Sequence, residues 1–167
     1  MKREFNDDHT PLGYLITFRT YGTWLHGDER GSVDRHHDIY GLPTLAPSSR
    51  RKQIERALLK QPPVKLSRRQ RVVIDRGMRE TCAIRGWELW ALNVRTNHLH
   101  CVVTANGNPK NVLVALKANA TLSMKTAGFW TSTLSPWARG GSKKYLWTEE
   151  ELANAIAYVV EDQGEPL

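Results

Sequence analysis

Apolar, β-branched and aromatic residues gather in four short runs of the chain, and longer segments carry helix signals. The runs predict strands, which we place at 14–20, 87–94, 98–104 and 144–147. The longer segments predict helices at 67–84, 108–128 and 148–162. From Gly22 to about Pro63 this pattern gives way to glycine, proline, histidine and charged residues, so a long insertion of about 22–66 follows the first strand. A short helix over 49–60 is expected inside it.

Three polar residues are predicted to begin the three main helices. Ser67 precedes Arg-Arg-Gln and is a candidate N-cap, and Asn108 is followed by Pro109 at the first helical position. Thr148, with Glu151 three residues later, has the spacing of a capping box. These signals place the helix starts next to the predicted strands.

The order of the elements predicts the fold class. After the first strand come the insertion, a helix, two strands, a helix, a fourth strand and a last helix. Two strands joined through a helix, then a hairpin and a returning helix, are typical of a split βαβ unit. We therefore predict an α+β, ferredoxin-like sandwich with a four-stranded antiparallel sheet and an added C-terminal helix. At 167 residues the whole chain, 1–167, is expected to form a single domain.

His98 and His100 lie two residues apart on a predicted strand. Side chains at this spacing point to one face, so both imidazoles can reach one metal ion, while Leu99 points to the opposite face. Imidazole is a ligand that suits Mn, Zn, Fe or Ni better than hard cations such as Mg²⁺. Two partly exposed strand histidines without a metal are the alternative. A metal site would also need a ligand from elsewhere in the chain.

Tyr158 stands out on the last helix. The apolar stripe of that helix consists of Leu152, Ala155, Ile156 and Val159. Tyr158 falls beside it, on the polar flank, with acidic residues nearby. A tyrosine in this position is either an interface residue or a nucleophile, because a phenoxide that attacks a phosphodiester forms a covalent phosphotyrosine. In the second case a metal would offset the charge that develops on the phosphate oxygens.

Composition and charge narrow the classes of protein. The hydrophobic fraction of 40% and the charged fraction of 25% are ordinary for a globular domain, and no segment approaches the length of a membrane span. The N-terminus has no apolar run, and the two cysteines lack CxxC spacing, so we expect a cytoplasmic protein without a disulfide framework. The net charge of +7 is compatible with binding to nucleic acid and with a solvated basic surface.

Several motifs together resemble a known family. Asn97-His98-Leu99-His100 is similar to the HUH signature (histidine, hydrophobic residue, histidine) of the single-tyrosine transposases, which include insertion-sequence and REP-associated enzymes. Three further stretches match this family in order, at 14–25, 137–142 and 147–161. The resemblance leaves out much of 27–66.

The resemblance implies a chemistry and a substrate. It implies Mg²⁺- or Mn²⁺-dependent cleavage of single-stranded DNA near a hairpin, with a 5′-phosphotyrosine on Tyr158 and a free 3′ hydroxyl. His98 and His100 take the role of metal ligands. The resemblance favours Gln163 as the third ligand, whereas regular helix spacing favours Asp162, and Glu161 is a further alternative.

Contacts to DNA are expected from cations and from the insertion. The candidate phosphate contacts are Arg19, Lys117, Arg139, Lys143 and Lys144. In the insertion, Trp24 lies among arginines and histidines, a mixture suited to stacking on bases, although a satellite apolar cluster around Trp24 is the alternative.

Other functions and assemblies stay open at this point. A non-catalytic, metal-free ferredoxin-like module that binds nucleic acid is the main alternative to a nuclease. A replication initiator or relaxase of the wider HUH group is another, against which the small size of the chain speaks. The sequence is compatible with a monomer and with a homodimer.

Overall fold

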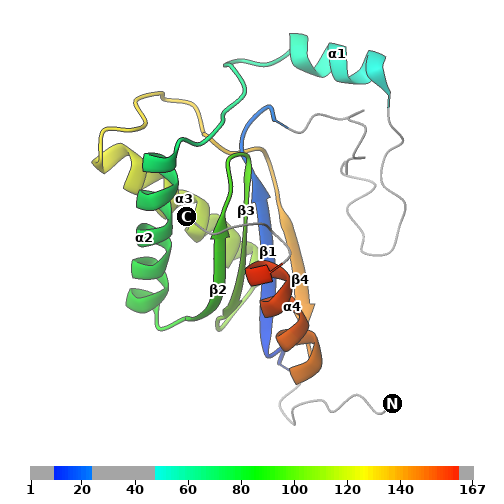
Figure 1. The fold of residues 1–167 in the computed structure, drawn as a ribbon, viewed down its shortest axis with the longest axis vertical. Coiled ribbons are helices and arrows are strands. Elements are labelled where there is room, and N and C mark those ends of the chain that lie inside the picture. The colour runs from blue at the N-terminus through cyan, green and yellow to red at the C-terminus, as the bar shows by residue number, and fades with distance from the viewer. Residues whose placement is uncertain (1–9, 24–47, 162–167) are drawn as a thin grey trace.

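Four strands and four helices make up the computed structural model, which describes residues 10–23 and 48–161 (Figure 1). The strands are β1 Gly13–Arg19, β2 Glu88–Val94, β3 His98–Thr104 and β4 Ser142–Leu146. The helices are α1 Ser49–Ala57, α2 Arg68–Arg85, α3 Pro109–Thr126 and α4 Glu149–Glu161. The strands form one sheet in the order β2-β3-β1-β4, with every neighbouring pair antiparallel. This confirms the predicted α+β, ferredoxin-like plan.

The helix starts follow the predicted caps closely. The N-caps at Ser67 and Asn108 are confirmed, because each side-chain oxygen accepts a hydrogen bond from a backbone N–H of its first turn. Thr148 also caps its helix by accepting from the Glu151 N–H at 3.1 Å. The Glu151 carboxylate differs from a regular capping box, since it accepts from the N–H of Trp147, one residue before the cap, at 2.7 Å.

The two faces of the sheet carry different helices and different cores. Alternate side chains of β1 and β3, among them Ile16 and Leu99, pack with Ile74 of α2 and Leu116 of α3 in the larger core. The opposite face is covered by α4 over a smaller core (Figure 1), which contains Ala91, Val102, Leu146, Ala155 and Val159. The smaller core leaves the other end of this face to polar residues, described below.

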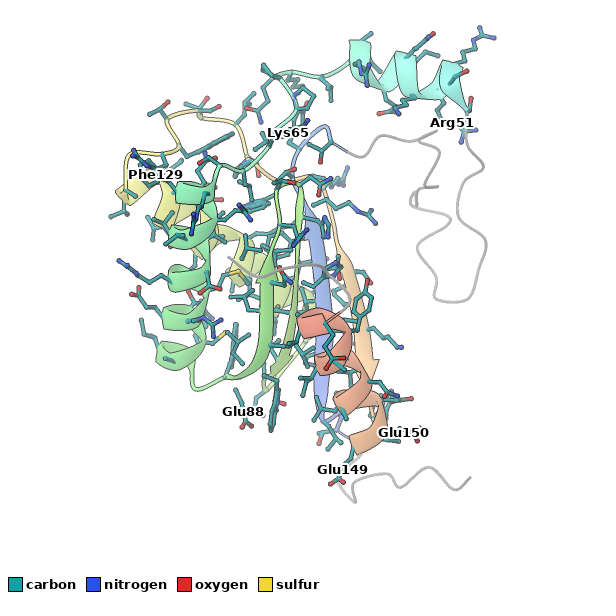
Figure 2. All side chains as sticks on the ribbon, viewed as in Figure 1. Arg51, Lys65, Glu88, Phe129, Glu149 and Glu150 are labelled. Carbon is teal, nitrogen blue, oxygen red and sulfur yellow. The ribbon has the colours of Figure 1, made fainter. Side chains whose placement is uncertain are left out.

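Several boundaries differ from the predictions by one to three residues. β4 begins at Ser142, two residues earlier than expected, because Ser142 pairs with Thr17 across the sheet and so extends the ladder. α1 ends at Ala57 rather than at 60. None of the side chains of α1 is buried, and the helix stands away from the sheet (Figures 1 and 2). Within the described residues, no helix has the length and apolar character needed to cross a membrane.

Candidate active site

His98 and His100 share the face of the sheet that α4 covers. Their ring centroids lie 4.8 Å apart with an interplanar angle of 76°. Between them, Leu99 is fully buried in the larger core on the opposite face. The burial of Leu99 therefore determines which way the two imidazoles point.

Tyr158 lies against these histidines in the same chain. The centroids of its ring and of the His100 ring are 5.5 Å apart, in an edge-to-face arrangement. The neighbouring Val159 is fully buried on the sheet, whereas the Tyr158 side chain is 38% exposed. The phenol thus stands at an edge that a large substrate can reach, next to an imidazole.

A buried asparagine fixes the end of α4 at this position. Asn93 is paired with His100 in the β2–β3 register, and its Nδ2 donates to the carbonyl of Val159 at 3.2 Å. Since Val159 follows Tyr158 directly, this bond ties the tyrosine's turn of helix to the strand beside the histidines. Sequence reasoning missed this residue, because only the strand register brings it under the helix.

Two further polar residues orient the imidazoles. Thr17 lies opposite His100 in the β1–β3 register, and its Oγ1 is 2.6 Å from His100 Nδ1. Asn97 Oδ1 is 2.6 Å from His98 Nδ1, and because an amide oxygen only accepts, this His98 nitrogen carries the proton. The Nε2 atom of His98 then has the lone pair. The Thr17 hydroxyl can also accept from His100 Nδ1–H, and in that arrangement the Nε2 atom of His100 has the lone pair that a metal ligand needs.

We predict that Thr17→Val weakens Mn²⁺ binding by about 10-fold or more, because supporting hydrogen bonds to metal-bound histidines are typically worth 10–100-fold in affinity. Isothermal titration calorimetry of Mn²⁺ with the intact protein measures the change. Thr17→Ser keeps the hydroxyl and is expected to bind like the original protein. Equal Mn²⁺ affinity of Thr17→Val and Thr17→Ser would rule out this positioning role.

No protein-family model and no curated protein matches the chain. The structure is similar to that of a REP-associated tyrosine transposase bound to a REP hairpin, with a TM-score of 0.52 and 10% identity. That match covers 95% of this chain and 68% of the other. The chain has a tyrosine-transposase fold.

A second solved structure is a protein of Deinococcus radiodurans R1 that is assigned as a transposase. Its TM-score is 0.48, its sequence is 16% identical, and the match covers 98% of both chains.

Within this tyrosine-transposase fold, the third metal ligand was predicted at the end of α4. Gln163 and Asp162, the two main candidates, lie outside the described residues. Glu161 is described and exposed. Over residues 10–23 and 48–161, no three or more histidine, cysteine, aspartate or glutamate side chains gather to hold a metal ion. The described residues thus contribute the two imidazoles, and Gln163 stays a prediction.

The candidate phosphate contacts divide between the two faces of the sheet. Arg19 is the register partner of His98, and Lys144 is that of Leu15, so both cations belong to the histidine face. Lys143 pairs with Ile16 and belongs to the opposite face, where its Nζ donates to the Gly141 carbonyl at 3.0 Å. Arg19 and Lys144 are therefore the two candidates that share the face of the proposed site.

Lys117 makes contacts within the protein on the face of the sheet opposite the histidines. Its Nζ donates to the carbonyls of Ala138, at 2.8 Å, and Gly140, and it lies 5.7 Å from the centroid of the Phe18 ring. Burial, and secondly the charge of Lys143, lower the pKa of Lys117 to about 8. Lys117 thus holds the loop before β4. Arg139, in that loop, is exposed, and Trp24 lies outside the described residues.

Gly141 brings the same loop close to the site. A Cβ on this residue would lie 2.8 Å from the Thr17 carbonyl and 3.0 Å from Leu113 Cδ2, so a larger residue does not fit. The close approach allows Ser142 to pair with Thr17, the residue that contacts His100. Close packing against the strand beside the histidines therefore explains why the 137–142 motif has a glycine at position 141.

Proposed function

We propose that this protein cleaves and rejoins single-stranded DNA near a hairpin in a metal-dependent reaction, through a 5′-phosphotyrosine intermediate on Tyr158. The observation that carries the proposal is the contact between the Tyr158 and His100 rings, beside His98, on one face of the sheet. A structural tyrosine would be expected to bury its ring on the apolar stripe, whereas Tyr158 extends beside a pair of oriented imidazoles. Transposition or the processing of REP-type elements is the context that the resemblance suggests.

The donor set fits a divalent metal ion. His98 and His100 would hold it through Nε2, and Gln163 would add an amide oxygen. Imidazole nitrogens favour Mn²⁺, while Mg²⁺ would rely more on oxygen ligands and water. When bound, Mg²⁺ or Mn²⁺ supplies Lewis-acid polarisation of a phosphate oxygen at this site.

The residues of the chain then account for the covalent step. Tyr158 Oη attacks the phosphorus, and the bond from phosphorus to the 3′ oxygen breaks as the Oη–phosphorus bond forms. The phenolic proton passes to water, and the departing 3′ oxygen takes up a proton to become a hydroxyl. Attack of a 3′ hydroxyl on the phosphotyrosine reverses these changes and releases Tyr158. Arg19 and Lys144, on the same face of the sheet, would neutralise strand phosphates.

The proposal predicts a covalent product. A 3′-labelled hairpin oligonucleotide with unpaired flanks, incubated with the protein and Mn²⁺, is expected to give a labelled protein–DNA adduct that survives denaturing electrophoresis, because the 3′ part of the strand stays on Tyr158. EDTA is expected to prevent its formation. Binding with steep salt dependence but no adduct, with or without Mn²⁺, would instead support the non-catalytic binding module.

A further inference from the structure

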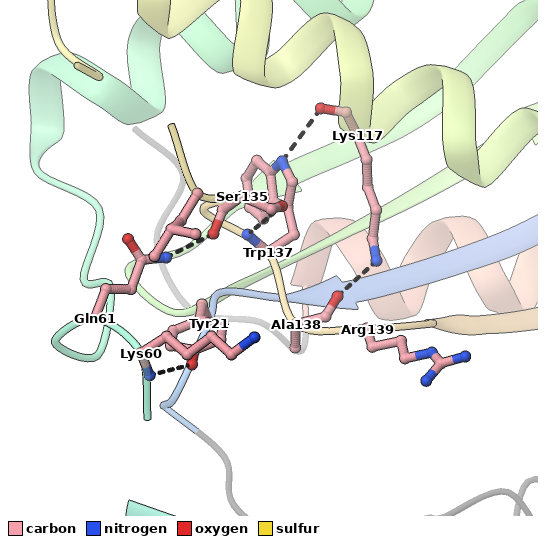
Figure 3. A pocket seen from close by; sticks show the side chains of 9 residues that line it. Tyr21, Lys60, Gln61, Lys117, Ser135, Trp137, Ala138 and Arg139 are labelled. Carbon is pink, nitrogen blue, oxygen red and sulfur yellow. Dashed lines mark hydrogen bonds between the residues drawn. The ribbon is translucent and has the colours of Figure 1, made fainter. Parts of the chain in front are cut away.

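A pocket of about 390 Å³ lies beyond the end of β1, at the edge of the larger core (Figure 3). Its walls are the turn after β1, the segment between α1 and α2, and the loop before β4, and Lys117 of α3 adds to the lining. Tyr21 and Trp137 contribute aromatic surface to it. Its volume falls in the range that small organic ligands occupy in proteins.

Hydrogen bonds hold the three walls together. The Tyr21 N–H donates to the Pro136 carbonyl at 2.8 Å, and the Tyr21 hydroxyl accepts from the Lys60 N–H at 2.9 Å. Gln61 Nε2 donates to the Ser135 carbonyl at 2.7 Å (Figure 3). The pocket is therefore built by pairing of its own walls, and a ligand would find it largely formed.

The lining of the pocket carries positive charge. Three of its nine lining residues are cations, Lys60, Lys117 and Arg139, and none of the nine is acidic. Arg139 is exposed, while Lys117 Nζ points to the Ala138 carbonyl (Figure 3). Because burial lowers the pKa of Lys117 to about 8, a nearby anion would favour its protonated form.

Backbone hydrogen bonds join the pocket to the histidine site. The Thr20 N–H donates to the carbonyl of Asn97, the residue that contacts His98, and the Ala138 N–H donates to the carbonyl of Arg19. The pocket and the histidine site therefore adjoin the same end of the sheet, where β1 ends and β3 begins. Its Lys60 and Gln61 belong to the insertion, which the family resemblance leaves largely uncovered.

We propose that this pocket binds one unpaired nucleotide of the DNA strand that the protein cleaves, with the base against Tyr21 and the phosphate between Lys60 and Arg139. The inference rests on the proposed function for the identity of the strand. An apolar aromatic wall with a cationic rim is the chemistry that single-stranded nucleic acid requires. The insertion thereby adds a specificity element beside the catalytic residues.

Binding of abasic oligonucleotides to two forms of the protein tests this inference. Hairpin oligonucleotides with one abasic position in an unpaired flank are titrated by fluorescence anisotropy in EDTA, so that no cleavage is needed. At one flank position, loss of the base is expected to weaken binding by about 10-fold, which corresponds to one base–aromatic stack. Ala138→Trp, which fills the pocket, is expected to reduce that effect to less than about 2-fold.

Arg139→Ala keeps the pocket open and provides a second readout if Ala138→Trp fails to fold. It is expected to reduce the slope of log affinity against log salt by about one, which is the change that follows from the loss of one phosphate contact. Arg69→Ala, an exposed arginine on α2, is the matched control, with an unchanged abasic profile and comparable unfolding temperature. If every abasic effect persists in folded Ala138→Trp, or if the Arg139→Ala salt slope equals that of the original protein, the pocket does not bind the strand.

Free mononucleotides test whether the pocket binds a nucleotide within a DNA strand or a free nucleotide. Titration of dAMP and dCMP by calorimetry is expected to show binding far weaker than that of the oligonucleotide. Saturable binding of a free nucleotide as tight as that of DNA would overturn the assignment to the strand. Because these assays measure binding alone, a protein that forms no adduct still gives a clear result for the pocket.

Discussion

Tyr158→Phe is expected to reduce formation of the covalent protein–DNA adduct by at least about 10³-fold, since removal of a nucleophile typically abolishes the chemical step. The substitution removes one hydroxyl and keeps the ring, so the contact with His100 and the packing of α4 should persist. Denaturing electrophoresis of labelled hairpin DNA after incubation with Mn²⁺ measures the adduct. DNA affinity in EDTA is expected to change by less than about 2-fold.

Tyr145→Phe provides the matched control. Tyr145 is 43% exposed, similar to Tyr158 at 38%, but it pairs with Tyr14 and lies on the other face of the sheet. Its variant should form the adduct at the original rate. An adduct that persists in Tyr158→Phe would exclude Tyr158 as the nucleophile, whatever the outcome for Tyr145→Phe.

Mixing two inactive variants tests whether one chain supplies the whole site. The structure places Tyr158 against His100 of the same chain. A mixture of Tyr158→Phe with His100→Ala is therefore expected to stay inactive. Recovery of the adduct in the mixture would show that the tyrosine acts beside the histidines of a second copy, in a homodimer.

His98→Ala and His100→Ala are each expected to lower the rate of adduct formation by at least about 10²-fold at a fixed Mn²⁺ concentration, because each removes one proposed metal ligand. His98 is the cleaner test, since its ring is only partly buried, whereas His100 is 7% exposed and its loss also opens space under α4. Rates across a Mn²⁺ titration, with DNA affinity in EDTA measured in parallel, distinguish lost metal binding from lost DNA binding.

His9→Ala serves as the control, since His9 lies in the N-terminal segment and outside β3. Its metal dependence is expected to match that of the original protein. Undiminished cleavage by His98→Ala at low Mn²⁺ would refute the metal-ligand role of that histidine. Thermal unfolding of each variant without metal checks that the fold is retained.

Much of the fold followed from local signals in the chain. The caps at Ser67 and Asn108 act within one helical turn, so their effect is visible in the sequence and was confirmed. The order of the elements led to the ferredoxin-like plan. The start of β4 was placed two residues late, because strand length depends on a partner strand, here on the pairing of Ser142 with Thr17.

The support of the site was harder to predict. Thr17 and Asn93 flank His100 on neighbouring strands, at large separations in the sequence, and only the register shows that they share its face. The sequence does not separate the five candidate phosphate contacts, whereas in the structure Lys117 and Lys143 lie on the face opposite the histidines. Lys117 in particular was predicted to contact phosphate, whereas its Nζ donates to loop carbonyls in the structure.

By itself, the sequence determined that His98 and His100 point the same way and that Tyr158 lies beside an apolar helix stripe, because both follow from the local periodicity of strand and helix. Only the tertiary structure decided that the two meet. The burial of Leu99 on one face and of Val159 on the other brings the rings into contact, and the register places Thr17 behind His100. Packing between distant segments has no period in the sequence, so it becomes visible only in the folded chain.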